Sequence, residues 1–361
     1  MKIVLLGENN SVHIQKWVKA IAMQQDVQLH VISFSGGPEI EGVNYYALKK
    51  ITGTRFDYML NLFRVKKLIQ KIAPNIIHAH YATSYGLLGA FSGFHPFVIT
   101  GWGADIFDSP SNPFMKRILQ FSFSKADAVT VLSQITKTEI GKLTNKPVDL
   151  VPFGVDINYF KPDETVTSKK SELIIGTIRT LKEKYGVEYL VKAFLALEEK
   201  FPNASLHIVG DGDQRTMLEE LAATSKQKNA IVFHGFVSQT KEPERYLSIL
   251  RSFDIFVIPS VIDSETFGVA AVEAAACAIP VVASCVGGLT EVVKDNETGI
   301  IVSPRNVKEL SAALEILLND EIKRKQFGNN GRKNAEQLYN WKNNVATMMN
   351  IYRRTIEEYK N

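Results

Sequence analysis

The sequence has little cysteine, with only Cys277 and Cys285 among 361 residues. Two thiols cannot form the dense disulfide framework of small secreted domains, and their spacing matches no zinc finger. The first ten residues contain only four consecutive large apolar residues, too few for the apolar core of a secretory signal peptide. The sequence therefore predicts a protein of the reducing cytoplasm.

Long uninterrupted apolar runs are also lacking. The longest weakly polar stretch, Gly268 to Leu289, is interrupted by Glu273, by Pro280 and by a pair of glycines. A membrane-spanning helix needs about 20 predominantly apolar residues. We therefore expect this stretch to form a helix, a turn and a strand of a water-soluble core.

Charge of one sign is not in large excess, since the formal net charge is +4. With so small an excess and no recognition motif, nucleic-acid binding is not expected. The charge is unevenly distributed, because residues 1–155 carry a net +6 and residues 156–361 carry a net −2. The basic first half is compatible with an anionic membrane or phosphorylated partners, although a solvated surface explains such an excess more often.

Short apolar runs typical of buried strands recur in two series, with helical stretches between them. The first series is KIVLLG, VQLHVISF, IIHAHY, PFVITGW, AVTVLS and VDLVPFG, and the second is LIIGTI, ASLHIVGDG, IVFHGFV, DIFVIPS, PVVAS and GIIVS. Strands that alternate with helices form parallel sheets covered by helices. The sequence therefore predicts an α/β protein with two Rossmann-like, doubly wound domains.

The apolar pattern is interrupted between Asp156 and Ser171, where Gly, Pro and charged residues cluster. Domain boundaries fall in such segments. We place residues 1–160 in the first domain and residues 161–340 in the second. A helix over residues 341–361 is expected to pack back on the first domain.

Two glutamates flank a Phe-Gly step in the stretch SETFGVAAVE, where Glu265 and Glu273 follow the predicted strand DIFVIPS. Open α/β sheets bind ligands at this carboxyl end of a strand. The backbone amides of Phe267, Gly268 and Val269 can face an anion at the beginning of the next helix. Carboxylates repel anions but accept hydrogen bonds from hydroxyls, so the pattern favours a nucleotide sugar, which has both hydroxyls and a diphosphate.

A cation for the diphosphate is expected in the stretch GTIRTLKEKYG, which carries Arg179 and Lys184. Arginine can bind phosphate oxygens in bidentate fashion, and lysine acts as a compact charge. Two basic residues at this spacing are more often surface charges. Their position after a strand and before Gly186 favours a functional role.

Six segments of the second half resemble the second domain of the retaining glycosyltransferases of family 4, which have the GT-B fold. They are GTIRTLKEKYG, LHIVGDGDQR, FHGFV, DIFVIPS, ETFGVAAVEAAACAIPVVAS and VGGLTEVV, in this order. The segment VPFGVDINYFKP is similar to the link between that family's domains. The resemblance is dense in the second half and looser in the first, and it implies two domains that face each other across a cleft.

The resemblance implies roles for individual residues. Glu265, Arg179 and Lys184 would be catalytic, with Glu265 on a donor-sugar hydroxyl and the two cations on the departing diphosphate. Glu273 would hold the ribose hydroxyls, and the backbone at Val237 would meet the base. The remaining donor-binding residues would be Thr266, Phe267, Gly268, Val269, Gly210 and Gly7. No metal and no other cofactor is expected, and Asp211 and Asp213 are not expected to bind a metal because they lie in a glycine turn.

The first half departs from the family pattern. Where many relatives have a histidine after a strand, this chain has Trp102, and Asp105 follows it. Trp102 is open to two interpretations, stacking on a sugar face or a place in the core. His80, at the end of a strand, and His13, before the first helix, are further candidates for the acceptor side.

The resemblance implies an enzyme that transfers a sugar, with retention, from a nucleotide-diphosphate donor to a hydroxyl, and we expect the acceptor to be a lipid-linked or cell-envelope glycan. Alternatives are a small soluble acceptor, a hydrolase, epimerase or phosphorylase on the same fold, and a non-catalytic nucleotide-sugar-binding subunit. The segments Arg55–Lys71 and Phe114–Lys125 mix basic with large apolar residues, which favours contact with the anionic inner face of a membrane. Packing of their apolar faces on the sheet is the alternative.

Overall fold

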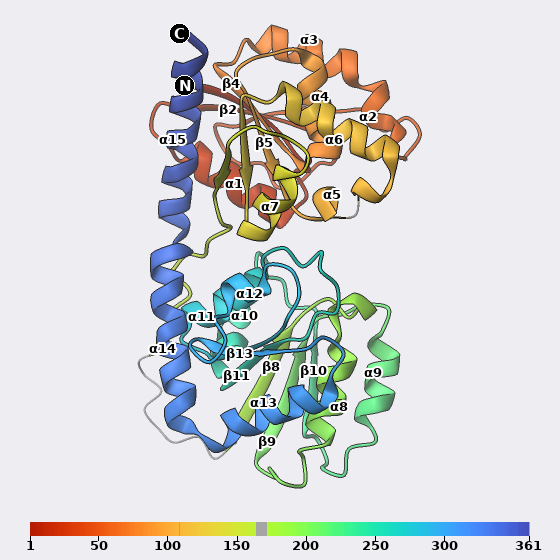
Figure 1. Ribbon diagram of the computed structural model, residues 1–361, viewed down its shortest axis with the longest axis vertical. Coiled ribbons are helices and arrows are strands. Elements are labelled where there is room, and N and C mark those ends of the chain that lie inside the picture. Colours follow the sequence, from red (N-terminus) through yellow and green to blue (C-terminus); the bar gives the residue numbers. More distant parts are fainter. Residues whose placement is uncertain (108, 164–171, 361) are drawn as a thin grey trace. The chain divides into compact units, whose positions relative to one another are not determined.

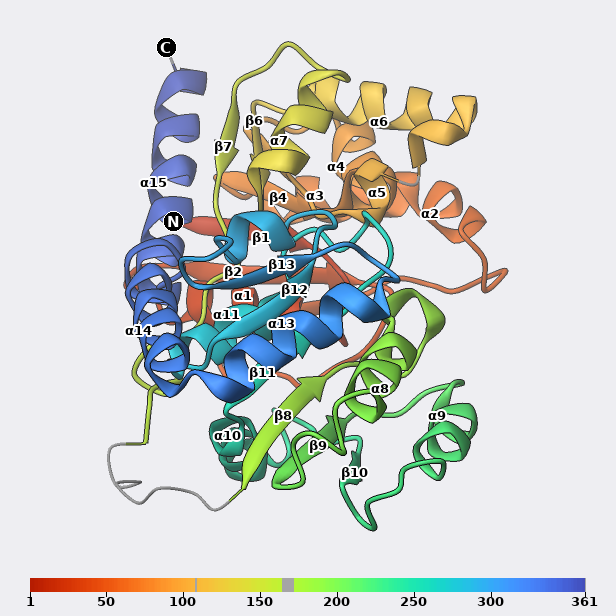
Figure 2. The same cartoon turned by 60° about the horizontal axis from the view of Figure 1, so that its bottom comes forward.

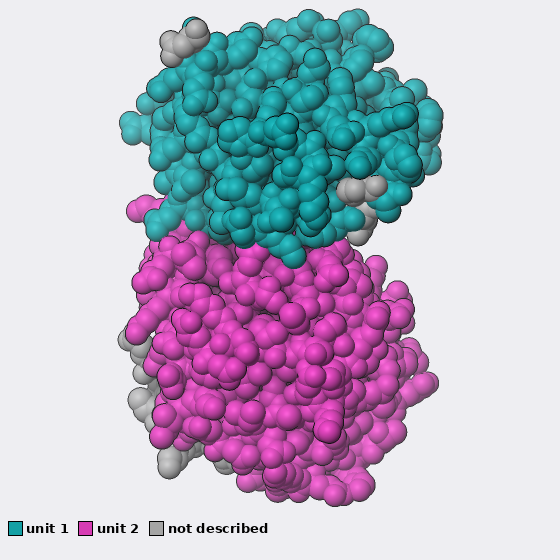
Figure 3. Space-filling model, in the orientation of Figure 1, with its two compact units in different colours: residues 1–152, 343–361 teal, residues 153–342 magenta. Residues whose placement is uncertain are grey.

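The computed structural model describes residues 1–107, 109–163 and 172–360 (Figure 1). The chain forms two compact units, of which unit 1 contains Met1–Pro152 with Asn343–Asn361 and unit 2 contains Phe153–Lys342 (Figure 3). The boundary thus lies at 152/153, whereas the sequence predicts it at 160/161. Residues 164–171 of the predicted link lie outside the described residues.

Unit 1 contains a seven-stranded parallel sheet in the order β3-β2-β1-β4-β5-β6-β7. Its strands are β1 (Lys2–Leu6), β2 (Gln28–Ser33), β3 (Asn44–Ala47), β4 (Ile76–His80), β5 (Phe97–Gly101), β6 (Ala128–Val131) and β7 (Val148–Leu150). Its helices are α1 (Val12–Ala22), α2 (Phe56–Leu60), α3 (Leu62–Ile72), the π-helix η1 (Tyr81–Tyr85), α4 (Gly86–Ser92), α5 (Ala104–Phe107), η2 (Ser109–Ser111), α6 (Pro113–Lys125) and α7 (Gln134–Gly141). Central strands such as β1 and β4 are buried along almost their whole length because helices cover both faces of the sheet.

Unit 2 contains a six-stranded parallel sheet in the order β10-β9-β8-β11-β12-β13. Its strands are β8 (Leu173–Ile178), β9 (Ala204–Val209), β10 (Ile231–Gly235), β11 (Ile255–Ile258), β12 (Val281–Ser284) and β13 (Gly299–Val302). Its helices are η3 (Glu183–Tyr185), α8 (Val187–Leu195), α9 (Arg215–Ala222), α10 (Pro243–Ser252), α11 (Val269–Ala276), α12 (Leu289–Val292), α13 (Val307–Asn319) and α14 (Glu321–Leu338). Helices α8 and α13 pack side by side, and α11 packs against α14 (Figure 2).

Each sheet changes its winding direction once. In unit 1 the change lies between β1 and β4, and in unit 2 it lies between β8 and β11. Open α/β sheets bind ligands at the carboxyl edge of the sheet at such a point. Residues 179–186 follow β8 and residues 259–268 follow β11, so both predicted catalytic stretches flank this point.

Each unit has its own hydrophobic core. The core of unit 1 includes Val4, Ile77 and Ile99, and the core of unit 2 includes Ile175, Leu206 and Val257. The helix α15 (Trp341–Lys360) belongs to unit 1 from Asn343 onward. Its Tyr352 is fully buried, and the hydroxyl of Tyr352 lies 2.6 Å from Nδ1 of His78 on β4.

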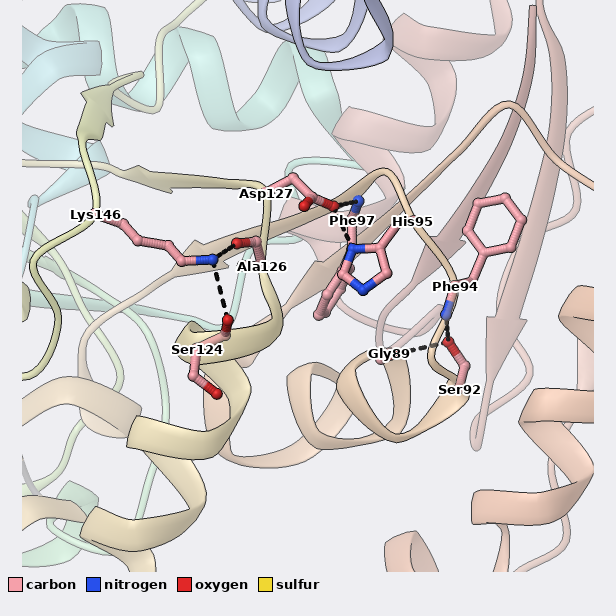
Figure 4. Close-up of polar contacts among 9 residues, drawn as sticks. All are labelled: Gly89, Ser92, Phe94, His95, Phe97, Ser124, Ala126, Asp127 and Lys146. Atoms are coloured by element: carbon pink, nitrogen blue, oxygen red, sulfur yellow. Dashed lines mark hydrogen bonds and ion pairs between the residues drawn. The ribbon is translucent and has the colours of Figure 1, made fainter. Parts of the chain in front are cut away.

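A polar cluster ties together the amino ends of β5 and β6 (Figure 4). The Asp127 carboxylate accepts hydrogen bonds from Nδ1 of His95 and from the Phe97 amide, both at 2.7 Å. Nζ of Lys146 donates to the carbonyl oxygens of Ser124, at 3.1 Å, and of Ala126. Because it lies at the amino edge of the sheet, opposite the carboxyl edge, we interpret this cluster as structural.

Across the described part of the chain, no helix is long and apolar enough to span a membrane.

Candidate functional site

The loops after β8 and β11 are fastened to each other. The Val261 amide donates to the Lys184 carbonyl oxygen at 3.0 Å. Gly186 has φ +65, and a Cβ there would lie 2.0 Å from the Pro259 carbonyl oxygen. Only glycine fits both conditions, which explains the glycine at the end of GTIRTLKEKYG.

Arg179, Ser260 and Glu265 form one polar unit across these two loops. Nη2 of Arg179 donates to the Ser260 hydroxyl at 2.8 Å and makes an ion pair with the Glu265 carboxylate. The Ser260 hydroxyl donates to the same carboxylate oxygen at 3.1 Å. The side chains of Arg179 and Glu265 are only 9% and 13% exposed, so water screens this pair weakly. The predicted cation and the predicted carboxylate are thus brought into direct contact.

Arg179 keeps donors for a further partner. A guanidinium has five N–H donors, and the bonds of Arg179 to Ser260 and Glu265 both use Nη2. Nε of Arg179 is buried without an acceptor among the described residues. The Tyr185 ring, whose centre lies 4.2 Å from Cζ, covers the guanidinium. Arg179 can therefore position Glu265 and still donate to an anion.

Lys184 is exposed, in contrast to Arg179. Its Nζ lies 4.9 Å from the centre of the Tyr185 ring, and within the described ranges no carboxylate forms an ion pair with it. The charge of Lys184 is therefore not neutralised by a neighbouring side chain.

The helix α11 begins beside Glu265. Gly268, with φ +73, precedes the first helical residue, Val269, and a Cβ on Gly268 would lie 2.4 Å from a Leu289 methyl carbon. The first amides of an α-helix have no acceptor within the helix, and they carry partial positive charge. The predicted residues Thr266, Phe267, Gly268 and Val269 thus form the approach to this helix end.

The motif VGGLTEVV supports this approach. The Gly288 amide donates to the Glu265 carbonyl oxygen at 2.9 Å, and a Cβ on Gly288 would lie 2.0 Å from the Thr266 carbonyl oxygen. Side chains at the glycine pair would push the 265–266 backbone away. The glycine pair therefore acts on the site through close backbone packing.

Glu273 is buried one turn further along α11 and is 4% exposed. Its carboxylate accepts hydrogen bonds from Nε2 of Gln239 at 2.8 Å and from the Tyr246 hydroxyl at 2.6 Å. Burial, together with the Glu273 charge, raises the pKa of Tyr246 well above its usual range, so Tyr246 remains a donor. Gln239 and Tyr246 therefore hold the Glu273 carboxylate in a fixed position.

The other predicted donor-site residues occupy three separate loops. Gly210, with φ +141, follows β9, and a Cβ there would lie 1.8 Å from the Arg179 carbonyl oxygen. Val237 is buried after β10, next to the exposed Phe236. Gly7 belongs to unit 1, where its amide donates to the Ile32 carbonyl oxygen at 3.2 Å. Gly210 therefore packs directly against the backbone of Arg179. Gly7 is not part of the group of residues in unit 2 that surrounds Arg179 and Glu265.

The four predicted acceptor-side residues come together in unit 1 around Trp102. The indole N–H of Trp102 donates to Nδ1 of His80 at 3.1 Å, and the His13 ring centre lies 5.7 Å from that of Trp102. The Trp102 amide donates to the Asp105 carboxylate at 3.1 Å. His80 and Trp102 are both buried, which favours the interpretation of Trp102 as a core residue.

Asp105 holds backbone in place. Its carboxylate also accepts from the amides of Ala82, at 2.7 Å, and Gly103, at 2.9 Å. Burial nevertheless raises the pKa of Asp105, because desolvation exceeds the effect of these hydrogen bonds. The geometry indicates that Asp105 fixes the loops after β4 and β5.

The histidines of this cluster are electrically neutral at pH 7. Burial, reinforced by Lys16, lowers the pKa of His13 to about 4. Burial, reinforced by His78, lowers the pKa of His80 well below its usual range. Because an indole N–H can only donate, Nδ1 of His80 is the acceptor, and its proton lies on the buried Nε2.

Sequence reasoning missed Ser260, Gln239 and Tyr246. Ser260 stands at the end of DIFVIPS, directly after the strand that points to the site, so its position was a usable signal. Gln239 and Tyr246 lie between the segments FHGFV and DIFVIPS, and only the fold brings them to Glu273. In the described ranges, no three side chains of the metal-binding types form a group that could hold a metal ion.

Two family models match the chain, one for each half. Residues 161–334 match "Glycosyl transferases group 1", and residues 2–133 match "Glycosyl transferase 4-like". The chain belongs to the group 1, family 4-like glycosyltransferases. This confirms the family resemblance of the sequence motifs.

Two glycosyltransferases are similar in sequence over part of their length. One is an uncharacterised glycosyltransferase of Methanocaldococcus jannaschii, 33% identical over 65% of this chain and 62% of the relative. The other is GDP-mannose-dependent monoacylated alpha-(1-6)-phosphatidylinositol monomannoside mannosyltransferase of Corynebacterium glutamicum, 30% identical over 66% of this chain and 65% of the relative. The matched region thus spans slightly less than two thirds of each relative.

A solved structure shares the whole fold. HepE of Anabaena in complex with UDP has a TM-score of 0.82 and 20% sequence identity, covering 98% of this chain and 100% of HepE. Together with the two parallel sheets, this likeness confirms the predicted GT-B type of α/β fold with two Rossmann-like domains.

Proposed function

We propose that this glycosyltransferase moves a sugar, with retention, from a nucleotide-diphosphate sugar to a hydroxyl of an acceptor. One observation carries the proposal. The Arg179–Ser260–Glu265 unit lies at the point where the sheet of unit 2 changes winding direction, beside the beginning of α11. A cation, a carboxylate and oriented amides in one place match a diphosphate joined to a sugar.

The diphosphate would receive three kinds of donor. Arg179 has a buried Nε without an acceptor among the described residues, Lys184 has an exposed ammonium, and the first amides of α11 point out of the helix. These groups would stabilise the charge that develops on the leaving group, and loss of one such preorganised donor typically costs about 10² to 10³ in turnover. No metal ion is then required for the reaction.

The two glutamates would accept hydrogen bonds from hydroxyls on either side of the diphosphate. Glu265, held by Arg179 and Ser260, would accept from a hydroxyl of the donor sugar. Glu273, held by Gln239 and Tyr246, would accept from the ribose. The acceptor hydroxyl would attack from the face that the diphosphate leaves, with a phosphate oxygen taking its proton, which gives retention. That HepE is seen with UDP supports a nucleotide in this fold.

We propose a lipid-linked or cell-envelope acceptor, reached at the anionic inner face of a membrane. The Corynebacterium relative is named for a phosphatidylinositol-based acceptor, which supports this class. In unit 1, α4 packs against α2, α3 and α6 (Figure 1). These helices expose a basic-apolar surface, made of Arg55, Phe56, Met59, Leu60, Phe63, Arg64, Lys67, Lys71, Phe114, Lys116 and Arg117.

Core packing explains only part of this surface. Val65, Ile69 and Ile72 of α3 are buried, as the packing alternative requires. Phe56, Phe63 and Phe114 remain 60% or more exposed, however, so the sheet does not cover them. A shallow pocket on α3 combines Phe63 and Leu68 with Arg64, Lys67 and Lys71. Each basic residue near an anionic surface contributes about 1 kcal/mol to binding.

The transfer reaction is tested by incubating the full chain with a panel of nucleotide sugars and envelope-type glycolipid acceptors. We expect release of the nucleoside diphosphate and a product whose anomeric configuration, measured by NMR, equals that of the donor. A chelator should leave the rate unchanged. An inverted product, or a strict requirement for added Mg²⁺ or Mn²⁺, would contradict the proposal.

The membrane contact is tested by co-sedimentation with vesicles of phosphatidylglycerol and phosphatidylcholine at low and moderate salt. We expect binding that falls with salt and is lost in the variant Lys67→Glu with Lys71→Glu. The matched control, Lys308→Glu with Lys333→Glu, reverses two exposed charges of unit 2 and should bind like the wild type. Absence of vesicle binding at low salt would indicate a soluble acceptor.

A further inference from the structure

Side chains that the transfer mechanism does not use gather at the winding change of unit 1. Glu8 follows β1, and Tyr81 and Tyr85 follow β4. The Tyr85 hydroxyl donates to the Glu8 carboxylate at 2.6 Å and accepts from the Phe34 amide at 3.1 Å. The Tyr58 ring packs edge-on against Tyr85, with ring centres 5.4 Å apart. These residues therefore form one aromatic cluster around a carboxylate.

Tyr81 has an unusual backbone conformation. Its φ is +70, although it is not glycine, and it begins the π-helix η1. Such a conformation costs about 1 to 3 kcal/mol and persists where the surroundings hold it, often at functional sites. Here the Asp105 carboxylate holds the next residue through the Ala82 amide. The Tyr81 ring stacks on Trp102, with ring centres 5.2 Å apart and an interplanar angle of 16°.

Two residues of the cluster have polar atoms that are available to bind a ligand. Tyr81 and Glu8 are both half-buried, so they remain accessible. Tyr85 binds only Oε2 of Glu8, and in the described part of the chain Oε1 has no hydrogen-bond partner. The Tyr81 hydroxyl likewise has none among the described residues. One acceptor and one hydroxyl are thus available beside an aromatic stack.

The electrostatic potential around Glu8 and Tyr81 is negative. Burial raises the pKa of Tyr81 to about 12, and the charges of Asp105 and Glu8 reinforce the shift. Tyr81 therefore stays protonated and can donate a hydrogen bond. A phosphate or carboxylate placed beside Glu8 would be repelled, whereas a sugar hydroxyl would be accepted.

We infer that Glu8 and Tyr81 form a subsite for an uncharged sugar ring of the acceptor. The inference rests on the proposed function, since it names the chemical class of the group that receives the transferred sugar. Aromatic rings suit the apolar face of a sugar, and a carboxylate next to a phenol suits its hydroxyls. The part of the acceptor that enters unit 1 is then neutral and rich in hydroxyls, even if a charged lipid anchor lies elsewhere on it.

Three variants of the full chain test the subsite. Glu8→Gln removes the charge but still offers Tyr85 an acceptor oxygen. Tyr81→Gly removes the ring and suits the positive φ, so the backbone can remain in place. Tyr81→Phe keeps the stack on Trp102 and removes only the hydroxyl. Circular dichroism and the unfolding midpoint establish that each variant is folded.

The measurement is saturation-transfer NMR with neutral methyl glycosides of common hexoses and N-acetylhexosamines, each compared with glucose 6-phosphate and glucuronate. We expect at least one neutral glycoside to bind the wild type, and about tenfold weaker binding in Glu8→Gln and Tyr81→Gly, the scale of one hydrogen bond to a charged group. The anionic sugars should bind weakly to the wild type and less weakly to Glu8→Gln. No neutral glycoside binding, a preference for the anionic sugars, or unchanged binding in both variants would overturn the inference.

Donor binding is measured in parallel as thermal stabilisation by nucleotide sugars. Glu8→Gln and Tyr81→Phe should leave this stabilisation unchanged. Failure of every nucleotide sugar to bind would count against the proposed function, whatever the glycosides do. Donor binding without neutral-sugar binding would overturn the subsite alone.

Discussion

Arg179 and Glu265 form an ion pair across two loops of unit 2, with Ser260 bonded to both. The sequence assigns these residues to different parts of a ligand, the cation to the diphosphate and the carboxylate to the sugar. Their contact means that each also holds the other in place. Removing one leaves a poorly hydrated charge without its partner, and that cost is added to any loss of ligand contact.

Substitutions of Arg179 and Glu265 should therefore have non-additive effects on the free energy of unfolding. Arg179→Ala and Glu265→Gln should each lower the free energy of unfolding, and the double variant should lose less than the sum of the two. Residues in direct contact show coupling of about 0.5 to 3 kcal/mol. Urea unfolding of the four proteins of this cycle measures the coupling. Additive losses would show that the ion pair is not maintained in solution.

Lys184 gives a cleaner test of charge stabilisation because it is exposed and makes no ion pair with a described residue. Lys184→Ala should lower turnover by about 10² while the unfolding midpoint stays unchanged. Lys182→Ala is the matched control, since it removes an exposed charge two positions away in the same loop. Equal turnover in the two variants would remove Lys184 from the mechanism.

Glu273 should govern affinity for the donor. In Glu273→Gln the side chain can still bond with Gln239 and Tyr246, but its charge is lost. We expect nucleotide-sugar binding to weaken by about 10-fold to 100-fold, the range for a hydrogen bond to a charged acceptor. Calorimetric titration measures this change. Glu244→Gln, an exposed position on α10, should bind donor like the wild type.

Gly210 should be essential although it has no side chain. A Cβ at this position would lie 1.8 Å from the Arg179 carbonyl oxygen, and φ is +141. Gly210→Ala must displace the backbone of Arg179, and misplacement of a catalytic group by about 1 Å can cost 10² in rate. The control is Gly141→Ala, where the added Cβ has no neighbour within 4 Å. Wild-type turnover in Gly210→Ala would contradict this packing argument.

Stability should fall with acid because unit 1 buries neutral histidines. Burial lowers the pKa of His78 to about 3 and lowers that of His80 well below the unfolded value of about 6.5. Below pH 6.5 the unfolded chain binds protons that the folded chain does not, so the free energy of unfolding decreases as the pH falls. Each such histidine contributes up to about 1.4 kcal/mol per pH unit until its folded pKa is reached.

The variant His80→Gln isolates one of these groups. Its amide oxygen can still accept from the Trp102 indole, but it does not titrate. Urea unfolding between pH 8 and pH 4 should give a shallower decrease for His80→Gln than for the wild type, with similar values at pH 8. Identical slopes would show that His80 is not buried in its neutral form.

Most strands could be predicted from the sequence because parallel strands are buried on both faces and therefore consist of apolar runs. All twelve predicted runs contain strands of the structure. The strand β3 (Asn44–Ala47) was missed, since its residues NYYA are only half-buried or exposed at the edge of the sheet and show no apolar run.

The candidate site was less predictable, since residues distant in sequence meet only through the fold. The motifs gave Arg179 and Glu265, 86 positions apart, but not their contact. Tyr246 and Gln239 reach Glu273 from the segment after β10. Trp102 and Asp105 were identified, but the left-handed conformation of Tyr81 that completes their cluster has no sequence signature, because glycine usually takes such positions.

The central claim, a nucleotide-diphosphate sugar held by Arg179, Lys184 and the beginning of α11, is tested most directly by thermal unfolding with a panel of nucleotide sugars. At 100 times its dissociation constant, a ligand of the folded state adds about 2.7 kcal/mol of stability. We predict that at least one nucleotide sugar stabilises the wild type and Lys182→Ala by this amount, and that Lys184→Ala with Arg179→Ala loses most of the effect. Equal stabilisation of the double variant and the wild type, or no stabilisation by any nucleotide sugar, would contradict the account.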